Sequence, residues 1–161
     1  MDRLYTPWRY AFIAGERPAN CVFCDKLAQS DEAALIVHRG AHAYICLNTF
    51  PYNNGHVLII PDAHVDSLAG VPAATLHEVA DLMQLTERVL RETYQPDGIN
   101  MGLNLGKAAG AGVAGHVHVH ALPRWTGDAN FMSVIGETRV LPEELSVTWA
   151  RLKTAFAASR S

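Results

Sequence analysis

The sequence contains few cysteines and no long apolar segment. Three cysteines in 161 residues are an odd number and do not form a disulfide framework. No apolar run approaches the length that a membrane-spanning helix needs. The first 20 residues include five charged side chains and no uninterrupted apolar stretch, so they do not resemble a signal peptide. We therefore expect a soluble, cytoplasmic protein without a membrane partner.

Basic residues are not in excess either. The 13 lysines and arginines are outnumbered by 16 aspartates and glutamates, which gives a net charge of -3 and a sequence pI of about 6.2. Surfaces that bind nucleic acids normally carry clustered lysine and arginine, so we expect no nucleic-acid partner. An anionic ligand would be held here by local dipoles and a few donors.

Low-complexity tracts are absent too, and 49% of the residues are hydrophobic. A chain of this length can bury a sizeable core and is most simply a single domain. Within that domain we expect an N-terminal arm over residues 1–20, a core over 21–140 and a C-terminal helix over 141–161.

The distribution of apolar residues predicts an α+β fold. Segments that alternate or are rich in β-branched residues predict strands at 33–37, 43–47, 55–61, 99–105 and 116–122. Cys46 falls inside the second of these and is expected to be a buried apolar residue. We expect these strands to form an antiparallel sheet of about five strands, with one long helix and a C-terminal helix packed on it.

The helices are predicted by apolar residues that recur with helical spacing. The long helix is expected over residues 72–94, with Leu76 and Val79 on its apolar face. Glu87 and Arg91 are four residues apart in it, so we expect an ion pair on its surface. The closing helix is expected over residues 142–157.

The segment His116–Leu122 alternates histidine with apolar residues. In a β-strand successive side chains point to opposite faces, so we expect the three histidines on one face and the apolar side chains on the other. Folding does not require a row of three imidazoles, each of which can donate, accept or attack near neutral pH. The candidate catalytic residues are therefore His116, His118 and His120.

A glycine-rich stretch, Gly106–Gly115, leads into this histidine segment. Glycine lets backbone N–H groups approach and surround an anion without interference from a Cβ atom. Lys107 can add a positive charge or extend into solvent, and the stretch alone is also compatible with a flexible connection. Its position directly before the histidines favours an anion site.

Cys21 and Cys24 form a Cys-x2-Cys pair. Three interpretations are open: half of a zinc site, a redox pair, or two buried thiols. A thioredoxin-like redox pair needs a neighbouring βαβ unit, which the sequence does not predict. A structural zinc site needs two further ligands, usually histidine or cysteine.

The histidine segment resembles the signature of the histidine triad (HIT) superfamily, in which apolar residues separate three histidines. Gly55–Pro61, an apolar strand that begins next to His56, resembles the second signature of that family. Pro123–Met132 and the aromatic N-terminal residues resemble its diadenosine tetraphosphate phosphorylase-like (ATP adenylyltransferase-like) bacterial branch. The resemblance extends over residues 4–140 and implies a HIT-like fold.

This resemblance implies a mechanism. In the family the middle histidine, here His118, attacks the α-phosphorus of a nucleotide and forms a nucleotidyl-histidine intermediate. The other ring nitrogen of His118 would donate to a backbone carbonyl in the loop Gly106–Gly115, and His56 would hydrogen-bond into the triad to fix its tautomers. The implied catalytic residues are His118, His120, His116 and His56.

The resemblance also implies substrate contacts. Asn48 stands where many relatives place an acidic residue on the ribose, and Asn104 where the family uses an amide on the phosphate. Relatives frequently carry serine or threonine near Gly112, and its absence here argues against a hydroxyl-assisted departure of the leaving group. The implied substrate-binding residues are Asn48, Asn104, Gly110, Gly112, Val113, Phe23 and Lys107.

Members of the superfamily with a Cys-x2-Cys pair often complete a zinc site with two histidines. The resemblance therefore implies a structural zinc, and no organic cofactor, with the ligands Cys21, Cys24, His64 and His116. It also implies a homodimer, because the family pairs two such units.

The implied function is cleavage of diadenosine polyphosphates or related adenine nucleotides, with phosphate favoured as the acceptor. With water as the acceptor, the enzyme would be a hydrolase of dinucleoside polyphosphates or nucleoside phosphoramidates. Two further alternatives are a hydrolase whose histidines hold a catalytic zinc with an open position and a low-turnover purine nucleotide-binding protein.

Overall fold

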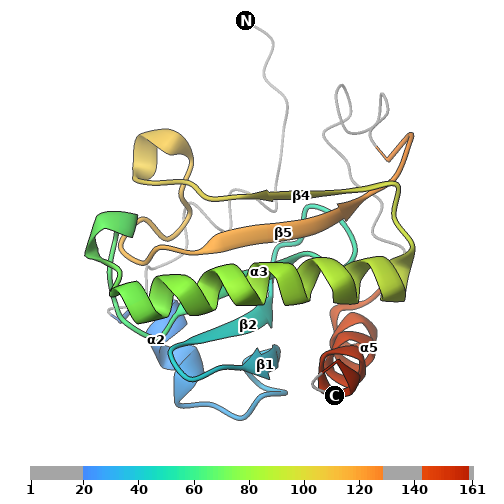
Figure 1. The fold of residues 1–161 in the computed structure, drawn as a ribbon, viewed down its shortest axis with the longest axis horizontal. Coiled ribbons are helices and arrows are strands. Elements are labelled where there is room, and N and C mark those ends of the chain that lie inside the picture. The colour runs from blue at the N-terminus through green and yellow to red at the C-terminus, as the bar shows by residue number, and fades with distance from the viewer. Residues whose placement is uncertain (1–19, 129–142, 160–161) are drawn as a thin grey trace, which may run out of the picture.

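The computed structural model describes residues 20–128 and 143–159. The expected N-terminal arm up to residue 19, and the part of the Pro123–Met132 resemblance beyond residue 128, lie outside the described residues. The described chain forms a five-stranded antiparallel sheet with strand order β1-β2-β3-β5-β4, covered by helices (Figure 1). The prediction of an α+β fold with a five-stranded antiparallel sheet is confirmed.

Four of the five strands differ from their predicted bounds, and only β2 agrees with them. The observed strands are β1 (Ile36–Arg39), β2 (Ala43–Leu47), β3 (Val57–Pro61), β4 (Gly98–Gly102) and β5 (Val119–Arg124). The strand predicted at 33–37 starts later because residues 33–35 form a turn, in which Leu35 has a positive φ of 57°. The strand predicted at 99–105 ends earlier, because its pairing with β5 stops at Gly102 opposite His120.

One face of the sheet is covered by the helices α3 (Ala73–Tyr94) and α5 (Leu145–Ala158), and in Figure 1 α3 runs in nearly the same direction as β4 and β5. Both predicted helices are confirmed, and the Glu87–Arg91 ion pair forms at 2.8 Å. The placement of Leu76 on the buried face is wrong, since its side chain is 41% exposed. The buried stripe of α3 is Thr75, Val79, Leu82, Thr86, Val89 and Leu90.

The other face of the sheet packs against the short helix α2 (Val22–Leu27). Leu58 and Ile60 point to this side, whereas Val57 and Ile59 point to the α3 side. Cys46 is fully buried among these residues, as predicted. The Tyr44 hydroxyl donates to the Phe23 carbonyl at 2.8 Å, which fixes α2 on the sheet. This α2 side is the face on which the histidines gather.

Two single-turn 3-10 helices complete the described chain, η1 (Leu68–Gly70) and η2 (Lys107–Ala109). Among the described helices, none combines the length and the apolar character that a membrane crossing requires.

Candidate active site and metal centre

The histidine segment enters the sheet later than predicted. Its ladder with β3 pairs Ile59 with Val119 and goes no further, so His120 alone of the three histidines lies in β5. Pro61, which would stand opposite Val117 in a longer ladder, has no N–H group to donate. The Val117 N–H instead donates to the Val65 carbonyl at 2.7 Å. The prediction of one continuous strand over 116–122 is therefore wrong for residues 116–118, which precede β5.

The imidazoles nevertheless lie together. The ring centroids of His118 and His120 are 4.9 Å apart, and both side chains sit on the α2 side of the sheet. His118 is only 4% exposed, and the Phe23 ring meets its imidazole edge-on with centroids 4.8 Å apart. Phe23 is itself 5% exposed, so it packs against His118 within the protein. Its role as a substrate contact stays a prediction.

The proton on His118 is placed by a backbone carbonyl. Its Nδ1 lies 2.8 Å from the His116 carbonyl oxygen, and because that oxygen only accepts, Nδ1 carries the proton. The neutral ring then keeps a lone pair on Nε2, the nitrogen a nucleophile needs. The acceptor was expected in the loop Gly106–Gly115, and the structure places it one residue beyond, on a member of the triad.

A second chain of hydrogen bonds sets the tautomer of His120. The Tyr52 backbone N–H donates to His56 Nδ1 at 3.0 Å, so the neutral His56 ring carries its proton on Nε2. That Nε2–H donates to His120 Nδ1 at 3.0 Å, which leaves His120 with an Nε2–H donor. The prediction that His56 hydrogen-bonds into the triad is confirmed.

Burial keeps these rings neutral. Desolvation lowers the pKa of His116 and of His118 below the ordinary value of histidine. The pKa of His120 falls to about 4, first because of burial and second because His118 lies close to it. All three imidazoles are therefore neutral at pH 7, one of them with an attacking lone pair and one with a donor.

Asn48 makes its contacts inside the site. Its amide nitrogen lies 3.3 Å from His56 Nδ1, and its carbonyl oxygen accepts the Phe50 N–H at 3.0 Å. The Tyr52 ring packs on both His56 and His120, with ring centroids 4.7 Å and 5.8 Å away. Asn48 thus supports His56, and its predicted contact with a ribose stays a prediction.

The glycine-rich loop precedes the triad as predicted from the sequence. Gly106 and Gly110 flank η2 with φ angles of 81° and 91°, which a β-carbon would disfavour. Lys107 and Gly112 are exposed, whereas Asn104 and Val113 are half-buried. The substrate contacts predicted for these loop residues stay predictions.

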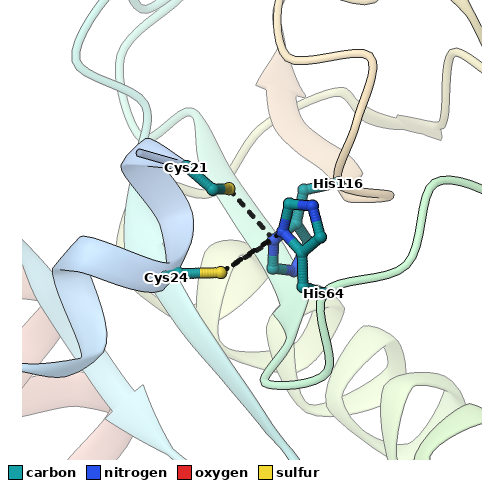
Figure 2. A group of neighbouring side chains, drawn as sticks. All are labelled: Cys21, Cys24, His64 and His116. Carbon is teal, nitrogen blue, oxygen red and sulfur yellow. Dashed lines mark hydrogen bonds between the residues drawn. The ribbon is translucent and has the colours of Figure 1, made fainter. Parts of the chain in front are cut away.

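Four side chains meet on the α2 side of the histidine segment (Figure 2). The ligand atoms of Cys21, Cys24, His64 and His116 all lie within 4.8 Å of one another. The sulfur-to-nitrogen distances are 3.3 Å for Cys21 to His116, 3.4 Å for Cys24 to His64 and 3.7 Å for Cys24 to His116. Tetrahedral zinc with ordinary Zn–S and Zn–N bonds would set such edges at about 3.5 Å. The four predicted zinc residues therefore fit that metal.

The orientation of His116 agrees with this fit. Its Nε2–H donates to the Pro61 carbonyl at 2.8 Å, so the lone pair on Nδ1 faces the two sulfur atoms. Desolvation and the neighbouring Cys21 raise the pKa of the Cys24 thiol, so a cation is what would favour two thiolates here. Four protein ligands leave no open position, which favours a structural metal over a catalytic one.

Sequence reasoning missed three residues that support the histidines. Tyr52 sets the tautomer of His56 through its backbone, and no side-chain pattern reports such a role. Asn53 and Asp128, 75 positions apart in the chain, share a hydrogen bond beside the end of β5. Asn53 stands just before Gly55–Pro61 and Asp128 lies within Pro123–Met132, two segments quoted for the resemblance, but only the folded chain brings them together.

The HIT domain model matches residues 16–127, which is more than half of the chain. The chain belongs to the HIT family. This HIT protein is 40% identical to a protein of Mycobacterium tuberculosis named AP-4-A phosphorylase, over 98% of this chain and 85% of that protein. It is 32% identical to an uncharacterized HIT-like protein of Methanocaldococcus jannaschii, over 74% of this chain and 89% of that one.

Solved structures agree with the family. A Zn-bound histidine triad family protein from Mycobacterium smegmatis superposes with a TM-score of 0.69 at 27% identity, covering 86% of this chain and 94% of that one. A HIT family member from Bacillus subtilis superposes with a TM-score of 0.60 at 27% identity, covering 67% of this chain and 75% of that one. The resemblance drawn from the sequence is confirmed.

Proposed function

We propose that this HIT protein cleaves diadenosine polyphosphates by transferring an adenylyl group through His118 to inorganic phosphate. The observation that carries the proposal is the hydrogen bond from His118 Nδ1 to the His116 carbonyl, which leaves a lone pair on Nε2. The 40% identity to a protein named AP-4-A phosphorylase supports the choice of substrate and acceptor.

In the first step, His118 Nε2 attacks the α-phosphorus of diadenosine tetraphosphate. The new N–P bond forms as the bond to the bridging oxygen breaks, and ATP leaves with that electron pair. The positive charge that develops on the ring is stabilised by the His116 carbonyl that accepts from Nδ1. The Nε2–H of His120 is placed to donate to a phosphate oxygen, because His56 occupies its other nitrogen.

In the second step, an oxygen of inorganic phosphate attacks the adenylylated His118. ADP is released and the neutral imidazole is restored. Backbone amides of the glycine-rich loop, with Asn104 and Lys107, would hold the phosphate oxygens in both steps. Splitting one displacement into two lets the same nucleophile and the same anion site serve both halves of the reaction.

Zinc bound to Cys21, Cys24, His64 and His116 would act as a structural cross-link. We also propose a homodimer, which follows from the family resemblance. Light scattering during size-exclusion chromatography at micromolar concentration tests that state directly, and a mass of one 17.6 kDa chain would contradict it.

The adenylyl intermediate is tested by intact-protein mass spectrometry after a brief, acid-free quench with diadenosine tetraphosphate. We expect an added adenylyl mass on the wild type and none on His118→Ala. Without phosphate the adduct should persist, and added phosphate should discharge it to ADP. Decay at the same rate without phosphate would identify a hydrolase. Failure to form an adduct, together with tight AMP binding, would identify a binding protein and contradict the proposal.

A further inference from the structure

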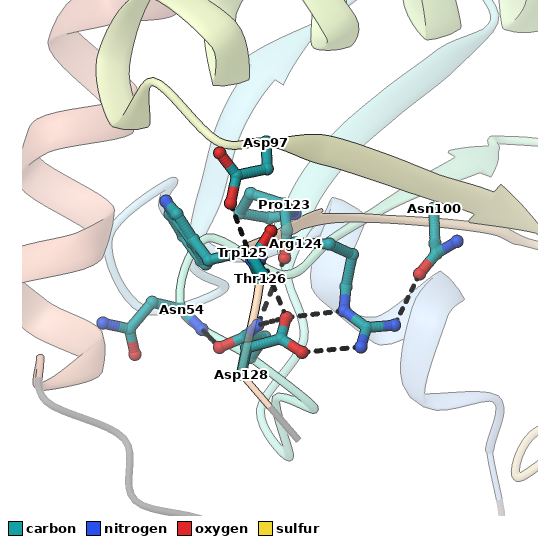
Figure 3. A network of polar contacts seen from close by, with 9 residues as sticks. Asn54, Asp97, Asn100, Pro123, Arg124, Trp125, Thr126 and Asp128 are labelled. Carbon is teal, nitrogen blue, oxygen red and sulfur yellow. Dashed lines mark hydrogen bonds and ion pairs between the residues drawn. The ribbon is translucent and has the colours of Figure 1, made fainter. Parts of the chain in front are cut away.

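A network of polar side chains surrounds the carboxyl end of β5 (Figure 3). Arg124 donates to both oxygens of the Asp128 carboxylate at 2.6 Å, and its third donor reaches Asn100 on β4 at 2.7 Å. The Trp125 backbone N–H also donates to Asp128, at 3.1 Å. The Asp128 side chain is only 12% exposed, so these charge-assisted bonds are partly shielded from water.

Asn53 connects this network to the loop that carries His56. Its amide nitrogen donates to Asp128 at 2.9 Å and to the Pro123 carbonyl at 3.2 Å. Its own backbone carbonyl accepts the His56 N–H at 3.3 Å. Asn53 is thus hydrogen-bonded both to His56 and to Pro123 of β5. His120 lies in the same strand, three residues before Pro123.

The distance between those two segments decides the geometry of the triad. His56 donates to His120 across 3.0 Å, and a hydrogen bond weakens steeply when its length or angle changes. The two rings belong to different segments, and the ladder between β3 and β5 begins one residue after His56, where Val57 pairs with Ala121. The ladder holds the two segments together on one side of the His56–His120 pair. On the other side, the Asn53 side chain links them through Pro123 and Asp128.

We propose that Asn53, Asp128 and Arg124 are positioning residues for nucleotidyl transfer: they fix the His56 loop on β5 and thereby hold His120 in the tautomer that donates to phosphate. We name these three residues the Asn53 clasp. The Asp128 carboxylate is the centre of the clasp, because Arg124 orients it and Asn53 donates to it. None of the three needs to touch the substrate in this role.

The test compares two variants and one control. In Asn53→Asp the donor becomes a carboxylate facing Asp128, so the clasp opens through charge repulsion. Asn53→Ala removes the donor without repulsion, in case Asn53→Asp does not fold. The control is Asp97→Asn, which replaces the charged acceptor of the Thr126 N–H with a neutral one and changes no bond to the His56 loop.

Two readouts separate positioning from stability. The first is the nitrogen NMR spectrum of His56 and His120 in the substrate-free protein, where Asn53→Asp should lose the pattern of an Nε2–H donor facing an unprotonated Nδ1. The second is steady-state phosphorolysis of diadenosine tetraphosphate, where kcat should fall about 10-fold with KM changed less than about twofold. Asp97→Asn should leave both unchanged.

The kinetic readout rests on the proposed function, whereas the NMR readout does not. A wild type without turnover would contradict the proposed function and leave the spectrum to decide on the clasp. Unchanged histidine signals in folded Asn53→Asp or Asn53→Ala would overturn the clasp, whatever the activity. The clasp is equally overturned if Asp97→Asn changes the signals and kcat as much as Asn53→Asp does.

Discussion

At the scale of single residues, backbone groups decide where the protons of this site lie. The His116 carbonyl fixes the proton of His118, and the Tyr52 N–H fixes that of His56. The Pro61 carbonyl does the same for His116. Backbone groups cannot change their donor or acceptor character, so each neutral ring has one tautomer. Chemically identical side chains thereby present different atoms: a lone pair on His118 Nε2, a donor on His120 Nε2 and a lone pair on His116 Nδ1.

The lowered pKa values predict activity in acid. An ordinary histidine with a pKa of about 6.5 would be only about one-tenth neutral at pH 5.5. Burial holds the pKa of His118 below that value and the pKa of His120 at about 4. Protonation removes the attacking lone pair, so the rate should fall only as the pH approaches these lower values. An ordinary histidine would lose roughly eightfold of its neutral form between pH 7 and 5.5, and we expect the rate of adenylylation, measured by mass without added phosphate, to fall by less than that.

The same shift has a consequence for stability, with a defined sign. Between pH 6.5 and about 4 the unfolded chain binds a proton at His120 that the folded chain does not. The free energy of unfolding should therefore decrease as the pH falls through this window.

For the kinetic prediction, a rate of adenylylation that declines tenfold between pH 7 and 5.5, while the fold persists, would contradict a neutral triad.

Gly55 is required by its backbone and by its neighbours. Its φ is +73°, and a β-carbon there would come within 2.8 Å of the Tyr94 ring and 3.2 Å of Pro123. We expect Gly55→Ala to lower the free energy of unfolding by about 1–3 kcal/mol in urea titrations and to reduce kcat by moving His56. Gly98→Ala is the matched control, because nothing lies within 4 Å of its β-carbon. Equal losses in both variants would contradict this explanation.

At the same scale, the sequence predicted which residues matter better than it predicted their partners. The family resemblance implied that His56 bonds into the triad and which four residues could hold zinc, and the structure brings these residues together. The partners Pro61, Tyr52 and Asn53 act through tertiary contacts, two of them through the backbone. Such contacts depend on strand register, and no local pattern encodes them.

At the scale of elements, the two longer helices were predicted from the sequence, whereas the short helix α2 and the strand ends were not. The long helix begins within one residue of its predicted start, since Pro72 precedes it and its apolar residues recur regularly. The prediction of its buried face was wrong because two polar residues, Thr75 and Thr86, belong to the buried stripe. The stripe therefore lies on a different side of the helix from Leu76. The start of β5 depends on a proline in another strand, which the histidine segment itself does not reveal.

Two of the leucines of α3, Leu76 and Leu90, give a matched test of this face. Leu90 is fully buried in the core between the sheet and the helices, whereas Leu76 is 41% exposed. We expect Leu90→Ala to lower the free energy of unfolding by about 2–4 kcal/mol. Leu76→Ala should lower it by less than about 1 kcal/mol. Chemical denaturation of both variants measures the difference, and a larger loss at Leu76 would show that the helix packs in another rotation.

At the scale of the whole molecule, the four residues that could hold a metal come from distant parts of the chain. Cys21 and Cys24 lie at α2, His64 follows β3, and His116 precedes β5. A zinc ion held by all four would fasten α2 and its Phe23 against the sheet that carries the triad. Folding and metal binding should therefore be coupled.

Removal of the metal tests this coupling. We expect about one zinc per chain by elemental analysis, and a melting temperature lower by at least about 5 °C after chelation. Cys24→Ala should reproduce both losses. Cys46→Ala is the control, because Cys46 is buried elsewhere in the core and should retain the zinc. A zinc content unchanged in Cys24→Ala would rule out the assigned ligands.

His116 serves two sites through two different parts of itself. Its imidazole belongs to the metal-ligating group, and its carbonyl orients the nucleophile. Every amino acid supplies a carbonyl, whereas few supply an aromatic nitrogen ligand. A single codon change at this position can therefore erase the metal centre and still leave the acceptor for His118 in the chain. Descendants of such a protein could lose metal dependence first and keep adenylyl transfer, so the two properties are free to evolve apart.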